Sequence, residues 1–485
     1  MQAFNPAMDE TNLDPEDWAA FRDGAHRLLD EALDRMAQYR EGPVWQDPGP
    51  LQRTFTSALP REGRALEPLI DQLITSHKGG IGNTHPRFFG WVHGAGTPLG
   101  LLSAMATATV NANCGGRDHL STRLERQIID WMRSLFGFPQ TTQGLLVSGT
   151  SMASIIALKA ARDRALGFTP AADGVGAHTL VAYTSHEAHS CVARAFDLLG
   201  LGTNALRKIP VTPDFKLDTA ALREAIDADR AAGLQPFAVI ASAGTVNTGA
   251  IDPLDDIADV AAENALWLHV DGAFGACLQF SQQLAPRLRG IERAASLAFD
   301  FHKWLHVTYD AGCVLVRDGD AQLRAFSKRP DYLQGTETGP AAGFPWAVDL
   351  GPELSRTDRA LKVWTHLQYF GTRRLGQQIE QNVAQIHALA DCIDHEPALE
   401  RLAPASLNIC CFRYRLLGQT EEAHNAFNLK LIRQLQSGGI ALPSDTRIGG
   451  NVAIRVNLTN HRTTQKDLDL FLAEVLKQGH AMVRA

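Results

Sequence analysis

From about residue 86 onward, the sequence alternates short apolar runs with stretches of helical periodicity. Runs that are apolar throughout are typical of strands buried on both faces of a largely parallel sheet. Helices between such strands cover the two faces, so the pattern predicts an α/β fold. The runs that we interpret as strands are GLLVS (144–148), TLVAYTS (179–185), FAVIAS (237–242), LWLHVD (266–271), ASLAFD (295–300) and GCVLVRD (312–318).

The two flanking regions differ from this central pattern. Residues 14–40 and roughly 62–76 have apolar residues at helical spacing, but a segment of about 85 residues with two or three helices has too little apolar surface to stand alone. We therefore expect residues 1–85 to pack on another surface, with a partner subunit as one candidate. After about residue 375 the sequence predicts helix, strand (407–414), helix (421–437), strand (451–458) and helix (464–478). The expected domains are 1–85, a large domain at 86–375 and a small α+β domain at 376–485.

Composition limits the function. The chain has 485 residues, a formal net charge of -7 and seven scattered cysteines. Nucleic-acid binding needs a concentrated basic face, so a small molecule is the better candidate ligand. The odd number of cysteines favours reduced thiols in a cytoplasmic protein. We expect no signal peptide, no membrane span and no metal, since DPLDDIAD (252–259) is typical of a helix start.

Polar residues follow several of the predicted strands, at the sheet edge where α/β proteins bind ligands. SGTSMAS (148–154) precedes a helix, so Thr150 and Ser151 either bind a phosphate or cap that helix. Asp271 ends its strand and needs a donor partner, unless it caps the next helix. His189 is either structural or catalytic. Thr245 and its neighbour Asn247 are either site residues or turn residues.

Lys303, in FDFHKWLH (299–306), adds an amine to these polar groups. An amine in an apolar site without a pairing group loses proton affinity, and a neutral amine can form a Schiff base with an aldehyde. Pyridoxal phosphate (PLP) needs a lysine, a carboxylate for its ring nitrogen, a flat group for its ring face and a phosphate cradle. A surface lysine is the alternative for Lys303 alone. The joint pattern favours a PLP site.

The segments YTSHEAHSCVARA (183–195), HVDGAFGA (269–276) and FDFHKWL (299–305) resemble those of the group II PLP-dependent amino acid decarboxylases, and the similarity covers nearly the whole chain. The resemblance implies a fold-type I homodimer with active sites between subunits and a mostly parallel seven-stranded sheet. It also implies that Lys303 forms the Schiff base and that Asp271 pairs with the ring nitrogen. The remaining implied cofactor contacts are His189 and Ala273 on the ring faces, Thr150, Ser151 and His302 at the phosphate, and Thr245 near the ring hydroxyl.

The implied reaction is decarboxylation of an L-amino acid, with an aromatic one preferred, to the amine and carbon dioxide. In relatives with aromatic substrates, a loop tyrosine reaches the reacting carbon, but residues 333–351 contain no tyrosine and Tyr332 is expected to be a framework residue. Related aldehyde synthases also have another residue at the loop position, so an oxidative reaction to an aldehyde is the alternative.

Substrate contacts are expected from Trp91, His93 and Phe344, although Trp91 and His93 also suit plain packing. Two further functions compete with decarboxylation. A non-catalytic PLP-binding protein would keep Lys303 without turnover. A nicotinamide oxidoreductase is disfavoured because GAGTPLG (94–100) does not have the G-x-G-x-x-G spacing.

Overall fold

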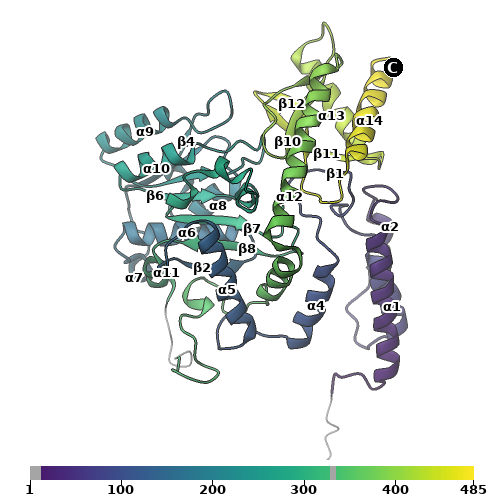
Figure 1. The fold of residues 1–485 in the computed structure, drawn as a ribbon, viewed down its shortest axis with the longest axis horizontal. Coiled ribbons are helices and arrows are strands. Elements are labelled where there is room, and N and C mark those ends of the chain that lie inside the picture. Colours follow the sequence, from purple (N-terminus) through teal and green to yellow (C-terminus); the bar gives the residue numbers. More distant parts are fainter. Residues whose placement is uncertain (1–11, 328–334, 485) are drawn as a thin grey trace, which may run out of the picture. The chain divides into compact units, whose positions relative to one another are not determined.

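The computed structural model describes residues 12–327 and 335–484, which form two compact units that meet in the sequence at Gly82 and Asn83 (Figure 1). The first unit contains helices α1 (Trp18–Ala37), α2 (Gly49–Phe55) and α3 (Leu66–Ser76). Asp17 caps α1 by accepting the N–H groups of Ala19 and Ala20. Gly24 of α1 lies against Ile70 of α3, and Arg27 forms ion pairs with Glu67 and Asp71 of that helix. Both predicted helices are therefore present, and α2 is an additional short helix in the Pro-rich connection.

The second unit contains a seven-stranded, mostly parallel sheet, as predicted, with the strand order β2-β8-β7-β6-β5-β3-β4. Only β8 runs antiparallel to its neighbours. The six interpreted runs are all strands, and β4 is an additional edge strand that the pattern missed because charged residues interrupt it. The bounds are β2 (Gln143–Val147), β3 (Leu180–Ser185), β4 (Leu206–Ile209), β5 (Gln235–Ser242), β6 (Trp267–Asp271), β7 (Ser296–Asp300) and β8 (Gly312–Val316).

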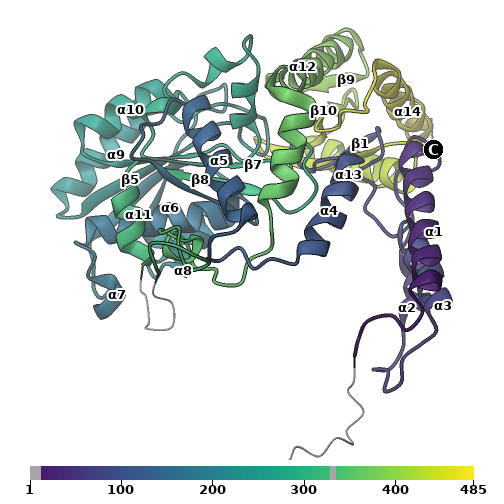
Figure 2. The same ribbon diagram turned by 60° about the horizontal axis from the view of Figure 1, so that its bottom comes forward.

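Helices cover both faces of this sheet, and Figure 2 shows the two helical layers. One layer contains α6 (Thr150–Ala165), α8 (Ser190–Leu198) and α11 (Gly319–Phe326), and the other contains α5 (Leu120–Leu135), α9 (Thr219–Ala231) and α10 (Leu254–Glu263). Along β3, Val181 and Tyr183 pack in the second layer, whereas Leu180 and Ala182 pack in the first. Both faces are apolar, which explains why the strands are apolar throughout.

A smaller five-stranded sheet has the order β1-β11-β12-β10-β9. Its strands are β1 (Phe88–Phe89), β9 (Leu399–Arg401), β10 (Ile409–Tyr414), β11 (Leu442–Ile448) and β12 (Asn451–Asn457), and its helices are α13 (Glu421–Ser437) and α14 (Gln465–Arg484). The long helix α12 (Ala360–His395) contacts α5 before its kink at Gly371 and the strands β9 and β10 after it. Because β1 pairs with β11, the segment that follows β1 starts at the small sheet.

Two shorter helices complete the second unit: α4 (Leu99–Val110) and α7 (Pro170–Asp173). Among residues 12–327 and 335–484, no helix combines the length and the apolar character that a bilayer span requires.

A buried ion pair fixes the first strand of the large sheet. Arg356, whose side chain is 1% exposed, lies 2.8 Å from Glu125 of α5, and the same carboxylate accepts the N–H of Leu146 in β2 at 2.7 Å. Removing one partner from a buried pair leaves an uncompensated charge. The pair therefore holds α5 on the strand that leads into the predicted phosphate loop.

Replacing Glu125 by glutamine is expected to lower the free energy of unfolding by about 3–5 kcal/mol, because Arg356 would keep its charge without its partner. Glu263→Gln is the control, since Glu263 pairs with Arg223 and both side chains are exposed. That control is expected to cost about 0–1 kcal/mol. Urea denaturation measures both values, and equal losses would contradict the assignment.

Candidate functional site

The carboxyl ends of β2, β3, β5, β6 and β7 meet at one cavity of about 540 Å³, a size that suits a cofactor with a small substrate. Ten of the eleven predicted site residues line this cavity, although they lie up to about two hundred residues apart in the sequence. These ten are Trp91, His93, Thr150, Ser151, His189, Thr245, Asp271, Ala273, His302 and Lys303. The eleventh, Phe344, lies elsewhere.

The start of α6 has the properties of an anion site. Gly149 is the N-cap of α6 and no side chain caps the helix, so neither Thr150 nor Ser151 acts as the N-cap. The hydroxyl of Thr150 is buried and has no hydrogen-bond partner among the described residues, while Ser151 is exposed. The N–H of Thr150 donates to the carboxylate of Asp300, but a buried unbonded hydroxyl at a helix N-terminus still suits a phosphate group. The residues here therefore fit the phosphate of PLP.

Asp271 is the last residue of β6 and is almost fully buried. Its Oδ1 accepts the N–H of Ala273 at 3.1 Å, and the thiol of Cys191 donates to its Oδ2 at 3.7 Å. Burial raises the pKa of Asp271, whereas the charge of Lys303 opposes that shift. A carboxylate in this position would gain from a protonated ring nitrogen.

His189 and Thr245 combine site and structural roles. His189 is the N-cap of α8, where its Nδ1 accepts the N–H of Cys191 at 3.2 Å, and its ring also lines the cavity. Burial lowers the pKa of His189, which favours a neutral flat ring. The hydroxyl of Thr245 accepts the N–H of Ala250 at 3.1 Å, as expected of a turn residue.

The expectation that Lys303 has no pairing group and a lowered proton affinity is wrong. Its Nζ lies 2.9 Å from Oδ2 of Asp300. Burial is the largest single influence and lowers the pKa of Lys303, but the Asp300 carboxylate, with smaller contributions from Asp271 and Tyr309, makes the net shift upward. The sequence shows a carboxylate three residues before the lysine. Because Asp300 was interpreted only as a strand end, the turn that brings the two side chains together was missed.

Tyr309 is a second cavity residue that the sequence did not single out. Its ring stacks against His302 with the centroids 4.4 Å apart, and its hydroxyl accepts the N–H of Gly94 at 3.4 Å. His302 is held in turn by the N–H of Ala311, which donates to its Nδ1 at 3.0 Å. The cavity therefore contains a phenol close in sequence to the turn of residues 301–305 that carries Lys303, the lysine turn.

The substrate-side loop at residues 90–98 lies directly against the lysine turn. A Cβ at Gly94 would lie 1.9 Å from the carbonyl oxygen of His302, so only glycine permits this approach. The rings of Trp91 and His93 lie 5.9 Å apart, and burial lowers the pKa of His93. Trp91 is 45% exposed and lines the cavity.

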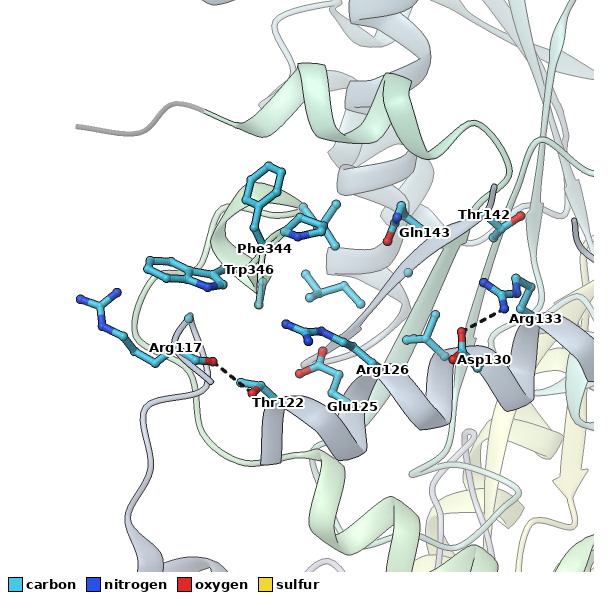
Figure 3. Close-up of a pocket in the computed structure, with 17 residues that line it drawn as sticks. Arg117, Thr122, Glu125, Arg126, Asp130, Arg133, Thr142, Gln143, Phe344 and Trp346 are labelled. Carbon is cyan, nitrogen blue, oxygen red and sulfur yellow. Dashed lines mark hydrogen bonds and ion pairs between the residues drawn. The ribbon is translucent and has the colours of Figure 1, made fainter. Parts of the chain in front are cut away.

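Phe344 lines a different cavity, of about 280 Å³, between α5 and residues 344–350. Figure 3 shows Phe344 and Trp346 across from Glu125 and Arg126. Within one chain, Phe344 is therefore not part of the first cavity. Tyr332 lies outside the described residues, as do residues 333 and 334 of the predicted loop.

Comparisons with known proteins identify the family of this chain. The family model of the pyridoxal-dependent decarboxylase conserved domain matches residues 48–415. An aromatic-L-amino-acid decarboxylase from Bacillus atrophaeus is 32% identical over 91% of this chain and 92% of its own length. A phenylacetaldehyde synthase from Petunia hybrida is 27% identical over 98% and 96% of the two chains. A crystal structure of Oryza sativa TDC with PLP and tryptamine has a TM-score of 0.88 and 26% identity, with 97% and 100% of the two chains covered.

Three buried histidines lie behind the lysine turn. His306 follows that turn, with its ring 4.9 Å from the ring of His461, and its Nε2 donates to Gln378 at 2.9 Å. His461 bonds the carbonyl of Gly96 in the substrate-side loop, and His366 of α12 bonds the backbone of Leu305. Burial lowers the pKa of His366 and of His461 to about 4, and that of His306 well below its ordinary value.

These three imidazoles make stability depend on pH. Below their ordinary pKa of 6.5, the unfolded chain binds protons that the folded chain excludes, so the free energy of unfolding should fall as the pH falls from 6.5 toward 4. His461→Gln is expected to flatten this slope in urea denaturation. The buried carboxyl of Asp252, with a pKa raised by burial to about 6, acts in the opposite direction, so the comparison between variants is the readout. An unchanged slope, equal to that of the exposed control His387→Gln, would contradict the prediction.

Proposed function

We propose that an aromatic L-amino acid is the substrate of this chain, which belongs to the pyridoxal-dependent decarboxylase family and is a PLP-dependent amino acid decarboxylase. One observation supports the proposed site: residues at or after the ends of five different strands line the same cavity. Lys303 would hold the aldehyde carbon of the cofactor and Asp271 its ring nitrogen. Thr150, Ser151 and the start of α6 would hold the phosphate, with His302 beside them.

When bound, PLP supplies a conjugated cationic ring that accepts the electron pair released as carbon dioxide leaves. The protein residues prepare that chemistry. Asp271 would hold the ring nitrogen, and its buried carboxylate would stabilise a proton there. His189 offers a neutral ring face. Lys303 is the only lysine among the described cavity residues, and it can carry a proton to or from the reacting region.

The cavity wall supports an aromatic side chain. Trp91, Val92 and Phe274 provide apolar surface, and no arginine is among the described residues that line the cavity. A substrate with an acidic side chain would need such a cation, whereas an aromatic ring gains from stacking on Trp91. The relatives named aromatic-L-amino-acid decarboxylase and TDC support the same choice.

A substrate panel tests the proposed function. With L-tryptophan, L-tyrosine, L-phenylalanine and L-glutamate, the aromatic amino acids should release carbon dioxide fastest, and Trp91→Ala should raise their KM by up to about tenfold through lost stacking. Trp364→Ala, away from the cavity, is the control. No carbon dioxide from any amino acid would favour the non-catalytic PLP-binding alternative, and glutamate as the best substrate would contradict the aromatic preference.

The same assay identifies the product. We expect the amine in amounts equal to carbon dioxide, because a phenol lies in the cavity to supply a proton. In the aldehyde alternative, which the name of the Petunia hybrida relative supports, dioxygen and water are consumed, and aldehyde, ammonia and peroxide are formed with the carbon dioxide in place of the amine. Two variants, Tyr309→Phe and Tyr332→Phe, identify the proton donor. The product should change from amine to aldehyde in the variant that lacks the donating phenol.

We further propose a homodimer with its active sites at the subunit interface, in the cytoplasm. Helix α4 is strongly apolar, yet Ser103 is its only buried residue, and Leu102, Met105 and Val110 are at least half exposed. Such a face suits a second copy of the chain. The seven free thiols suit a reducing compartment. Analytical ultracentrifugation should show a dimer that Met105→Asp weakens, and a monomeric wild-type protein would contradict the proposal.

A further inference from the structure

Asp300 is a buried carboxylate that lines the cavity. It is 1% exposed and ends β7. Its Oδ2 lies 2.9 Å from Nζ of Lys303, and its Oδ1 accepts the N–H of Thr150 at 2.8 Å. The Nε2 of His302 is 3.7 Å from the same carboxylate. Asp300 therefore joins the reactive amine to the first N–H group of α6.

Other ionisable groups face Lys303, but they are held by different partners. Asp271 is bonded to Ala273 and Cys191, and the hydroxyl of Tyr309 accepts the N–H of Gly94. Among the described residues, only Asp300 forms an ion pair with Lys303. The pKa of Lys303 is raised by Asp300 of β7, by Asp271 of β6 and by Tyr309. The charge of Lys303 in turn lowers the pKa of five other groups near the cavity: His93, His189, Cys191, Cys277 and His302. It also acts on Asp271 and Tyr309.

We propose that Asp300 is the positioning residue of Lys303: its carboxylate holds the ammonium group whenever the amine is not bonded to carbon, and it thereby sets the pH at which Lys303 becomes a nucleophile. The amine must release its proton to solvent before its lone pair can attack a carbonyl carbon. A buried anion at 2.9 Å opposes that release, whereas burial alone would favour it. The inference rests on the proposed role of Lys303.

The reactivity of the amine tests this role without turnover. The cofactor-free full-length chain is treated with trace acetic anhydride at about pH 8.5, and peptide mass spectrometry compares acetylation of Lys303 with that of the exposed Lys477. In Asp300→Asn, which keeps the volume and an acceptor for the N–H of Thr150, Lys303 should react at least about tenfold faster, since one pKa unit is a factor of ten. Asp310→Asn, which removes a nearby carboxylate that pairs with Arg359, is the control and should leave the rate unchanged.

Two further measurements keep the test decisive. Asp300→Ser, with a smaller side chain that still offers an acceptor oxygen, replaces Asp300→Asn if that variant does not fold. In the wild-type chain, the pH midpoint for acetylation should lie higher for Lys303 than for Lys477. A folded Asp300 variant with an unchanged Lys303 rate, or a wild-type midpoint at or below that of Lys477, would overturn the proposal. Decarboxylation by the wild-type enzyme is measured separately, so such a result would leave the proposed function intact.

Discussion

The buried carboxylate of Asp300 is the interaction on which the geometry of the site depends. A buried charge must be paired and hydrogen-bonded, so Asp300 draws together the lysine turn and the start of α6. These two segments supply the amine and the anion site that a phosphorylated aldehyde cofactor needs. Asp271, at the end of the neighbouring strand β6, then lies across the same cavity.

The small sheet fixes the other wall of the cavity through a second buried charge. Arg455 of β12 is 3% exposed and is bonded to carbonyl and hydroxyl oxygens rather than to a carboxylate. Its guanidinium donates to the carbonyls of Trp91 and Val246, and burial lowers its pKa to about 10. Two residues that line the cavity, Trp91 and Val246, are therefore held by a side chain of the small sheet, which lies more than two hundred residues beyond Val246 in the sequence.

Much of this fold follows from periodicity, because strands buried on both faces must be apolar throughout. The edge strand β4 escaped that rule, since only its terminal residues are buried and Arg207 and Lys208 interrupt it. The two-residue strand β1 gives no periodic signal at all. Its pairing with β11 is a long-range contact that only the folded chain reveals.

The lining of the cavity was predictable where a residue lies at a strand end or just after one, as for Asp271 and Lys303. Pairings across turns were not. The sequence pattern predicted Asp300 only as the end of a strand. Its ion pair with Lys303 depends on the backbone turn that follows this strand, and residue periodicity does not predict the geometry of such a turn. Phe344, an aromatic residue of the expected loop, lines another cavity within one chain, together with Trp346 and residues of α5.

The most direct test of the account is the site of cofactor attachment. The purified protein is reduced with borohydride and digested, and the modified peptide is identified by mass spectrometry. We predict a stable pyridoxyl group on Lys303 and the loss of the visible absorption band. A pyridoxyl group on any other lysine, or an unchanged band and full activity in Lys303→Ala, would contradict the central claim.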